Sequence, residues 1–165
     1  MLRLTLFRHG KSSWDDVDIN DFERPLAPRG LRDVPEMGRR LAALGKPPAL
    51  IISSPARRAL STARAIAREA DCREERIVEE PGLYLAAPQQ ILAILQGAAD
   101  APDHILLVGH NPGFTDLANM LDDVRINNMP TAAMLIVEFD VPRWADIIPA
   151  QARFIAFDYP KKRPA

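Results

Sequence analysis

The chain has 165 residues, of which 47% are apolar and 26% are charged, a composition typical of one globular domain rather than of a disordered chain. Its 21 Lys and Arg residues nearly balance 22 Asp and Glu residues, so it lacks the basic excess of a general nucleic-acid or anionic-membrane binder. The single cysteine, Cys72, excludes an internal disulfide and a cysteine-based zinc cluster. Because no apolar run approaches the roughly 18 residues of a spanning helix, we predict a soluble, cytoplasmic protein.

The first half of the chain alternates apolar runs of strand length with helical patterns. Residues 2–7 predict a strand, and residues 29–44 predict a helix that ends at Gly45 and either is kinked by Pro35 or holds it in the first turns. A continuous apolar run at 50–52 indicates a strand buried on both faces. Residues 56–70 then carry one apolar stripe, and the preceding Ser53-Ser54-Pro55 offers a serine cap and a proline for the first turn.

The second half continues the alternation and then changes. A short strand is expected at 76–78, a helix at 88–96 ended by Gly97, a buried strand at 105–108, and a helix from Asn111-Pro112 to Leu121. Strands at 134–139 and 152–157 follow without room for a helix between them, so they are expected to be antiparallel or at the sheet edge. This order indicates the α/β class with a largely parallel sheet.

One domain is predicted over residues 1–165. The 15 prolines lie in loops and at helix starts and therefore mark no domain boundary. The tail over 160–165, which includes Lys161-Lys162-Arg163, is expected to be a frayed, solvated end rather than a docking segment.

Polar side chains follow three of the predicted strands at the point where each strand ends. These groups are Arg8-His9-Gly10, then Ser53-Ser54-Pro55-Ala56-Arg57-Arg58, and Gly109-His110-Asn111-Pro112. Ligands of open α/β sheets bind outside the carboxyl ends of the strands, so two histidines and up to three arginines should meet there. The glycine beside each histidine is expected to let backbone N–H groups approach a ligand. His104 precedes its strand and is expected to be an exposed or hydrogen-bonded loop residue at the opposite edge.

Such a cluster predicts a phosphate pocket without a metal or cofactor. Arginine forks match tetrahedral oxyanions, and helix N-termini add N–H donors. The chain has no Walker-type loop, no carboxylate cluster suited to a magnesium phosphatase, and no evident third ligand to complete a zinc site with the two histidines. Metal-free phosphate chemistry then needs a side-chain nucleophile, and a neutral imidazole can serve.

The three blocks in this order resemble those of a known family. Arg8-His9-Gly10, Ser54-Pro55-x-x-Arg58-Ala59-x-x-Thr62-Ala63 and Gly109-His110 are similar to the histidine phosphatase (phosphoglycerate mutase-like) superfamily. Asp21-x-x-Arg24-Pro25-Leu26-x-x-x-Gly30 and Leu106-Leu107-Val108-Gly109-His110-Asn111-Pro112-Gly113 resemble its SixA-type phosphohistidine phosphatase branch. The resemblance spans about residues 2–140. It implies a single three-layer α/β/α domain with a mostly parallel central sheet and an antiparallel edge.

The resemblance also implies roles for particular residues. His9 would be the nucleophile that becomes phosphorylated, and Asp21 and Arg24 would lie near the pocket and bind substrate. The residues that would hold the phosphoryl oxygens are Arg8, Arg58 and His110. The motif register selects Arg58 over Arg57, which the residues alone cannot distinguish, so Arg57 is expected to face solvent.

The chain departs from the mutase pattern at the proton donor. Larger members carry a glutamate after the third strand, whereas this stretch is Gly82-Leu83-Tyr84-Leu85. Glu79 and Glu80 lie just upstream; either could be the acid, and otherwise both are solvated loop carboxylates. An alkoxide leaving group needs a proton, whereas the imidazole of a phosphohistidine can leave already protonated. The missing acid therefore favours a phosphohistidine substrate.

The leading hypothesis is a metal-independent phosphatase that hydrolyses phosphohistidine on a protein, such as a histidine phosphotransfer domain, through a covalent intermediate on His9. One alternative is a phosphatase of a small phosphate ester, a sugar or another metabolite, with Glu79, Glu80 or Asp21 as acid. Mutase activity is disfavoured because the chain lacks the extra length of that branch. A phosphate-binding module without turnover conflicts with the retention of all the implied pocket residues. Neither nucleic acid nor membrane is expected as a partner.

Overall fold

The apolar runs form a six-stranded sheet in the computed structural model, which describes residues 1–121 and 125–162. The strands are β1 (Leu2–Arg8), β2 (Leu50–Ser53), β3 (Ile77–Glu79), β4 (His104–Gly109), β5 (Met134–Phe139) and β6 (Arg153–Asp158). Their order across the sheet is β3-β2-β4-β1-β5-β6. Every residue of the central β4 is buried, as its continuous apolar run predicts.

Strand direction confirms the predicted mostly parallel sheet with an antiparallel edge. β3, β2, β4 and β1 are parallel neighbours, whereas β5 is antiparallel to β1 and β6 is antiparallel to β5. Arg8 is paired in register with Gly109, and Ser53 with Val108. The carboxyl ends of β1, β2 and β4 therefore meet at one edge of the sheet.

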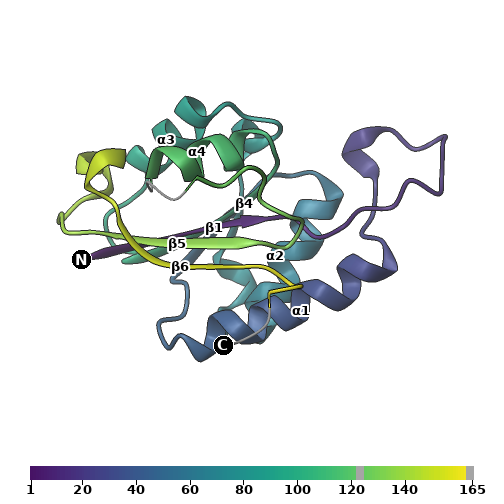
Figure 1. The fold of residues 1–165 in the computed structure, drawn as a ribbon, viewed down its shortest axis with the longest axis horizontal. Helices are drawn as coiled ribbons and strands as arrows, with labels where there is room; N and C mark the ends of the chain where they lie inside the picture. Colours follow the sequence, from purple (N-terminus) through teal and green to yellow (C-terminus); the bar gives the residue numbers. More distant parts are fainter. Residues whose placement is uncertain (122–124, 163–165) are drawn as a thin grey trace.

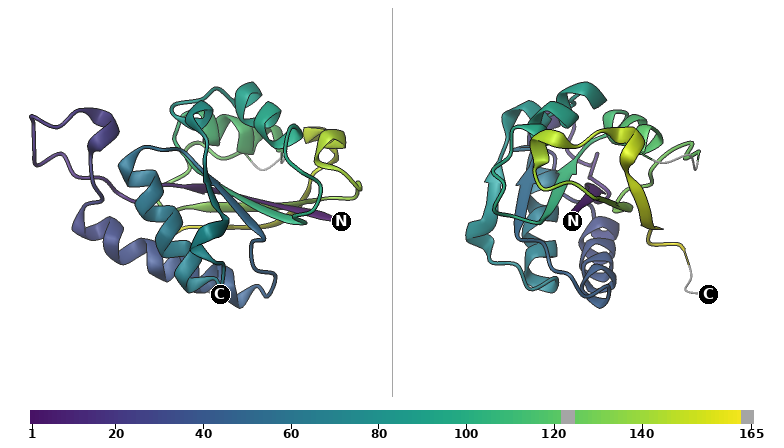
Figure 2. Two further views of the ribbon diagram at one scale, coloured as in Figure 1. Left: turned by 180° about the vertical axis from the view of Figure 1, so that it is seen from behind. Right: turned by 90° about the vertical axis from the view of Figure 1, so that its left-hand side faces the viewer.

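Two helices cover each face of the sheet and complete the predicted three layers (Figures 1 and 2). α1 (Pro28–Ala43) and α2 (Arg57–Glu69) lie on one face, and α3 (Pro88–Gln96) and α4 (Gly113–Leu121) on the other. Each pair encloses its own apolar core, with Leu107 and Phe114 in one and Met37 and Ile66 in the other. Both cores draw on β1, because alternate side chains of a strand point to opposite faces.

Three helix starts differ from the predictions by one or two residues. α1 begins at Pro28, with Pro35 inside the helix, and α4 begins at Gly113, after Asn111-Pro112. α2 begins at Arg57, so Pro55 precedes the helix. The hydroxyl of Ser54 accepts the N–H of Ala56 within the turn before α2 and does not cap the helix, because a serine side chain can bond to its own neighbouring backbone.

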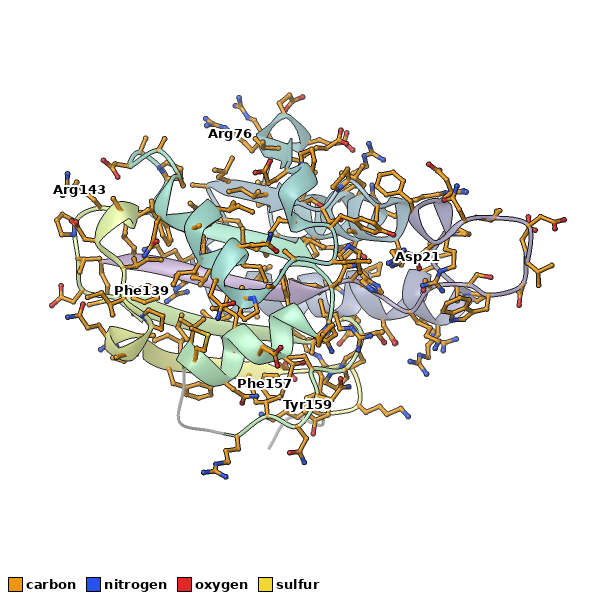
Figure 3. All side chains as sticks on the ribbon, turned by 90° about the horizontal axis from the view of Figure 1, so that it is seen from above. Asp21, Arg76, Phe139, Arg143, Phe157 and Tyr159 are labelled. Atoms are coloured by element: carbon orange, nitrogen blue, oxygen red, sulfur yellow. The ribbon has the colours of Figure 1, made fainter. Side chains whose placement is uncertain are left out.

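The segment between β1 and α1 projects beyond the end of the sheet in Figure 1 and in the left view of Figure 2. An isolated antiparallel bridge between Ser12 and Leu26 closes its base. A single 3-10 turn, Asp21–Glu23, lies within it, capped by the side chain of Asn20. Figure 3 shows Asp21 at the end of the molecule opposite Arg143.

The tail contacts α1 as far as the structure describes it. The Arg40 guanidinium donates to the carbonyls of Tyr159, Pro160 and Lys162. Fraying over 160–165 stays a prediction, since residues 163–165, with Arg163, lie outside the described residues. None of the described helices is both long and apolar enough to span a bilayer.

Candidate active site

His9 follows β1 directly, and its contacts hold its ring neutral in one tautomer. Its Nδ1 lies 2.6 Å from the carbonyl oxygen of Gly10, so Nδ1 must carry the hydrogen and donate it. Nε2 therefore carries the lone pair, and the Nε of Arg58 donates to it at 3.4 Å. The side chain is only 6% exposed, and burial lowers the pKa of His9 to about 3.

Arg58 lies between the two histidines that follow β1 and β4. It belongs to the first turn of α2, is 3% exposed, and also donates to the Nδ1 of His110 at 3.3 Å. The ring centroids of His9 and His110 are 5.1 Å apart. Arg57, one residue earlier, is exposed. The motif register thus selected the arginine that points into the site.

His110 is held in the opposite tautomer by its own two contacts. Because Nδ1 accepts from Arg58, Nε2 carries the hydrogen, and it donates to the hydroxyl of Ser54 at 2.8 Å. Burial, and then the charge of Arg58, lower the pKa of His110 to about 3. The sequence placed Ser54 at this edge of the sheet and offered it or Ser53 as a helix cap, but did not predict its contact with His110.

Arg8, the last residue of β1, brings a second guanidinium close to Arg58 and the two histidines. Its NH1 donates to the carbonyl of Met129 at 2.8 Å, while its buried Nε has no acceptor among the described residues. Burial, and then the charge of Arg58, lower its pKa. An arginine remains charged in proteins, so Arg8 keeps both its charge and unused donor capacity there.

Asp21 anchors Arg58 from the projecting segment. One carboxylate oxygen accepts from the NH2 of Arg58 at 3.0 Å and from the hydroxyl of Tyr84 at 2.5 Å, and the backbone carbonyl of Asp21 accepts from NH1 at 2.6 Å. Burial acts to raise the pKa of Asp21, but the hydrogen bonds from Tyr84 and Arg58 hold it at about 2. The carboxylate is therefore ionised and a poor proton donor.

Tyr84 is a residue of this site that sequence reasoning missed. Besides its bond to Asp21, its ring packs edge-on against His110, with centroids 5.4 Å apart and planes at 86°. It lies in the 82–85 stretch, which the sequence analysis considered only for its lack of a glutamate. The aromatic side chain in that stretch was the one sequence feature that could have indicated its role.

Arg24 forms a second ion pair with Asp21 and supports an indole. Its Nε donates to the other carboxylate oxygen of Asp21 at 3.2 Å. Its guanidinium carbon lies 3.5 Å from the ring centroid of Trp14, a cation–π contact. The Arg24 side chain is buried between the two partners.

The two histidines and the three arginines of this site line a cavity of about 200 Å³ with a positive lining. Its basic and imidazole side chains are Arg8, Lys11, Arg24, Arg58, His9 and His110. Among the residues that the structure describes, no carboxylate lines it. A cavity with arginine forks and a neutral imidazole suits a tetrahedral oxyanion next to a nucleophile.

Comparison with known proteins agrees with this geometry. Residues 4–84 match the model of the histidine phosphatase superfamily (branch 1). An uncharacterized protein of Mycobacterium tuberculosis is 32% identical over 165 residues, which cover 93% of this chain and 99% of that protein. The chain belongs to the histidine phosphatase superfamily.

Two further relatives refine the assignment. An uncharacterized chloroplastic protein of Arabidopsis thaliana is 34% identical over 145 residues, covering 83% of this chain but 66% of that protein. The crystal structure of the putative phosphohistidine phosphatase SixA from Agrobacterium tumefaciens superposes with a TM-score of 0.81 at 25% identity, over 96% of this chain and 98% of that one. This histidine phosphatase is of the SixA type, as the motifs predicted.

The two candidate acids lie away from the cavity of this histidine phosphatase. Glu79 ends β3 and is exposed, and Glu80 is half-buried. Neither side chain lines the cavity. Glu79 and Glu80 therefore do not bring a carboxylate to the cavity in place of the glutamate that larger family members carry.

The glycines beside the histidines are required by close packing, and the approach of their backbone N–H groups to a ligand stays a prediction. A Cβ on Gly109 would lie 2.6 Å from the ring of Phe114, and one on Gly10 would lie 2.6 Å from Val34. The N–H of Gly10 donates to the hydroxyl of Thr62. Both glycines therefore face the cores on either side of the sheet.

The third histidine of this phosphatase lies at the opposite edge, as predicted, but not in a loop. His104 is the first residue of β4 and is fully buried. Its Nε2 pairs with the hydroxyl of Thr5 and its Nδ1 with the carbonyl of Lys46, each at 2.8 Å. It is a hydrogen-bonded core residue.

Proposed function

We propose that this histidine phosphatase hydrolyses phosphohistidine on a protein, without a metal, through a covalent phosphohistidine on His9. The observation that carries the proposal is a cavity that combines a neutral imidazole with guanidinium donors and has no lining carboxylate among the described residues. Such a site can attack phosphorus and stabilise charge but cannot readily protonate an alkoxide. A phosphohistidine avoids that need, because its leaving imidazole can carry its own proton.

In the first step the lone pair on Nε2 of His9 attacks phosphorus. The phosphorus–nitrogen bond to the substrate breaks, and its electron pair stays on the leaving imidazole, which departs neutral when its other nitrogen is protonated. The phosphoryl oxygens take the Arg58 donors that now face His9 and His110, and Arg8 adds its charge. The phosphorylated ring becomes cationic, and the carbonyl of Gly10 stabilises it through the Nδ1–H.

In the second step a water oxygen attacks the same phosphorus. The bond from phosphorus to Nε2 breaks, the electron pair returns to Nε2, and the proton of the attacking water leaves with inorganic phosphate or to solvent. His9 is then neutral again. Neither step needs a metal ion or a cofactor.

The proposed partner is a phosphorylated protein such as a histidine phosphotransfer domain, in the cytoplasm. The structural similarity to the putative phosphohistidine phosphatase SixA from Agrobacterium tumefaciens supports this substrate class. The alternative of a small phosphate ester would need an acid, and the carboxylate nearest the site, that of Asp21, is held ionised with a pKa of about 2. That alternative is an outcome of the test below.

Trapping the intermediate tests the proposal. Wild-type enzyme mixed with a radiolabelled phosphohistidine protein and quenched in alkali should carry an acid-labile, alkali-stable phosphoryl group on His9. His9→Ala should carry no label and show no turnover, whereas His104→Gln should still be labelled, because His104 lies at the far edge of the sheet.

Two results would contradict the mechanism. One is label on a serine or an aspartate. The other is loss of activity with EDTA that a divalent ion restores. Efficient hydrolysis of a sugar phosphate with no turnover of phosphohistidine would instead support the small-ester alternative.

A further inference from the structure

Two exposed apolar side chains line the mouth of the positive cavity. Trp14 is 68% exposed and comes from the projecting segment, and Leu85 is 57% exposed and comes from the loop before α3. His9, by contrast, is almost fully buried in the same cavity. The cavity thus has a charged floor and an apolar entrance.

Leu85 is held there in an unfavourable backbone conformation. Its φ is 53°, in the left-handed region that a leucine rarely adopts and that glycine adopts freely. The exposed side chain contributes little to the core in return. Backbone strain of this kind clusters at ligand-binding positions. The position of the Leu85 side chain at the entrance therefore indicates a contact with substrate.

The indole of Trp14 is held in position by its contact with Arg24. The Arg24 guanidinium lies against one face of the indole, and Arg24 is itself fixed by Asp21. The high exposure of Trp14 leaves the rest of the indole open. A flat apolar surface is therefore offered on the rim of the cavity that holds His9.

We propose that Trp14 and Leu85 form the leaving-group subsite, a slot that takes the imidazole ring of the substrate's phosphohistidine. This inference rests on the proposed function. In an in-line transfer the leaving group points away from the nucleophile, so a phosphoryl group on buried His9 directs the leaving group to the exposed entrance. A planar ring can stack on an indole, whereas sugar hydroxyls would lie unpaired against apolar walls.

Variants of Trp14 test one wall. Trp14→Ala should lower kcat/KM on a phosphohistidine protein about tenfold, and Trp14→Phe should recover most of the loss. Inhibition by inorganic phosphate, which contacts only the charged residues of the cavity, should be unchanged. Val17→Ala is the matched control, because Val17 is 89% exposed on the same projecting segment and does not line the cavity.

Leu85→Gly tests the other wall and the strain together. Glycine accepts the φ of 53°, so the variant should keep or raise Tm while kcat/KM on the phosphohistidine protein falls. Asp71→Gly is its control, because Asp71 has a φ of 57° and lies outside the cavity. It should keep Tm and full kcat/KM.

The outcomes separate the subsite from the proposed function. If wild-type enzyme turns over phosphohistidine but Trp14→Ala and Leu85→Gly retain full kcat/KM, the subsite is wrong and the function stands. If phosphate inhibition weakens in parallel with kcat/KM, Trp14 acts through Arg24 and the subsite is also wrong. If wild-type enzyme does not hydrolyse phosphohistidine, both proposals fail.

Discussion

At the scale of single residues, hydrogen-bond partners determine which nitrogen of each histidine can react. Gly10 accepts from Nδ1 of His9, and Ser54 accepts from Nε2 of His110. Arg58 donates to the remaining nitrogen of each ring. Both rings are therefore held neutral and in opposite tautomers, and each directs its lone pair toward Arg58.

The histidine tautomers can be observed directly. At pH 6 a long-range ¹⁵N–¹H spectrum should show three neutral rings, with His9 protonated on Nδ1 and His110 on Nε2. Burial lowers the pKa of His9 and His110 to about 3 and that of His104 to about 4, so none should titrate between pH 8 and 5. A ring in the wild-type protein that titrates near 6.5 would contradict the assignment.

The same pKa values fix how stability depends on pH. The unfolded chain binds protons at its histidines near pH 6.5, and the folded chain binds them only below about pH 4. The free energy of unfolding should therefore fall as the pH drops from 6.5 toward 4, by at most about 1.4 kcal/mol per pH unit for each histidine. Urea unfolding of His104→Gln should show a shallower slope.

The two neighbouring arginines give the sharpest comparison of single side chains. Arg58→Ala should lose about 10²–10³-fold in kcat, by analogy with the removal of an oxyanion-hole donor. Arg57→Ala should hardly change kcat, and it should change stability by about 0.5 kcal/mol or less, because Arg57 is exposed. Steady-state kinetics of the two variants measure the difference. If Arg57→Ala lost more kcat than Arg58→Ala, the motif register would be wrong.

At the scale of elements, close backbone contacts position α4, which begins just after His110. A Cβ on Gly113 would lie 2.0 Å from the carbonyl oxygen of Ala86. The loop that carries Tyr84 and Leu85 therefore rests directly on the first turn of α4. Any side chain at this position must push the loop and the helix apart.

Gly113→Ala should consequently destabilise the protein and reduce activity together. The overpacking should cost about 1–3 kcal/mol, with a loss of kcat because His110 and Tyr84 are displaced. Gly97→Ala is the control, because its Cβ would meet Ala93 at 3.5 Å, an ordinary contact. Thermal unfolding and kinetics measure both effects, and equal stability of the two variants would contradict the close contact.

At the scale of the whole molecule, the topology brings strand ends from distant parts of the chain to one site and leaves the candidate acids outside it. β1, β2 and β4 converge there with the projecting segment, whereas β3, which ends at Glu79, is the edge strand beyond β2. The proposed preference for a phosphohistidine substrate therefore rests on which strands adjoin the cavity.

Replacing both Glu79 and Glu80 by Gln should leave phosphohistidine turnover nearly unchanged. General acid catalysis contributes about 10²–10⁴-fold to a rate. A wild-type enzyme that has no general acid should therefore hydrolyse an unactivated alkyl phosphate more slowly than phosphohistidine by a factor of that order. Parallel assays of the two substrates measure the gap. Fast hydrolysis of a sugar phosphate that the double variant loses would assign the acid to this pair.

Much of the fold and the place of the site could be predicted from local sequence. Continuous apolar runs indicated strands buried on both faces, and polar residues directly after those runs indicated the edge where His9, Arg58 and His110 meet. Local patterns suffice here because burial and strand direction are properties of each segment and its connections.

Only the tertiary structure decided which side chains act on one another. Tyr84 bonds to Asp21 across 63 positions of the chain, Ser54 contacts His110 rather than capping a helix, and the ring of Phe114 leaves no space for a Cβ at Gly109. Leu85 also takes its left-handed φ with no local signal. Periodicity reports that a residue is buried, but its partner is set by packing between segments far apart in the chain.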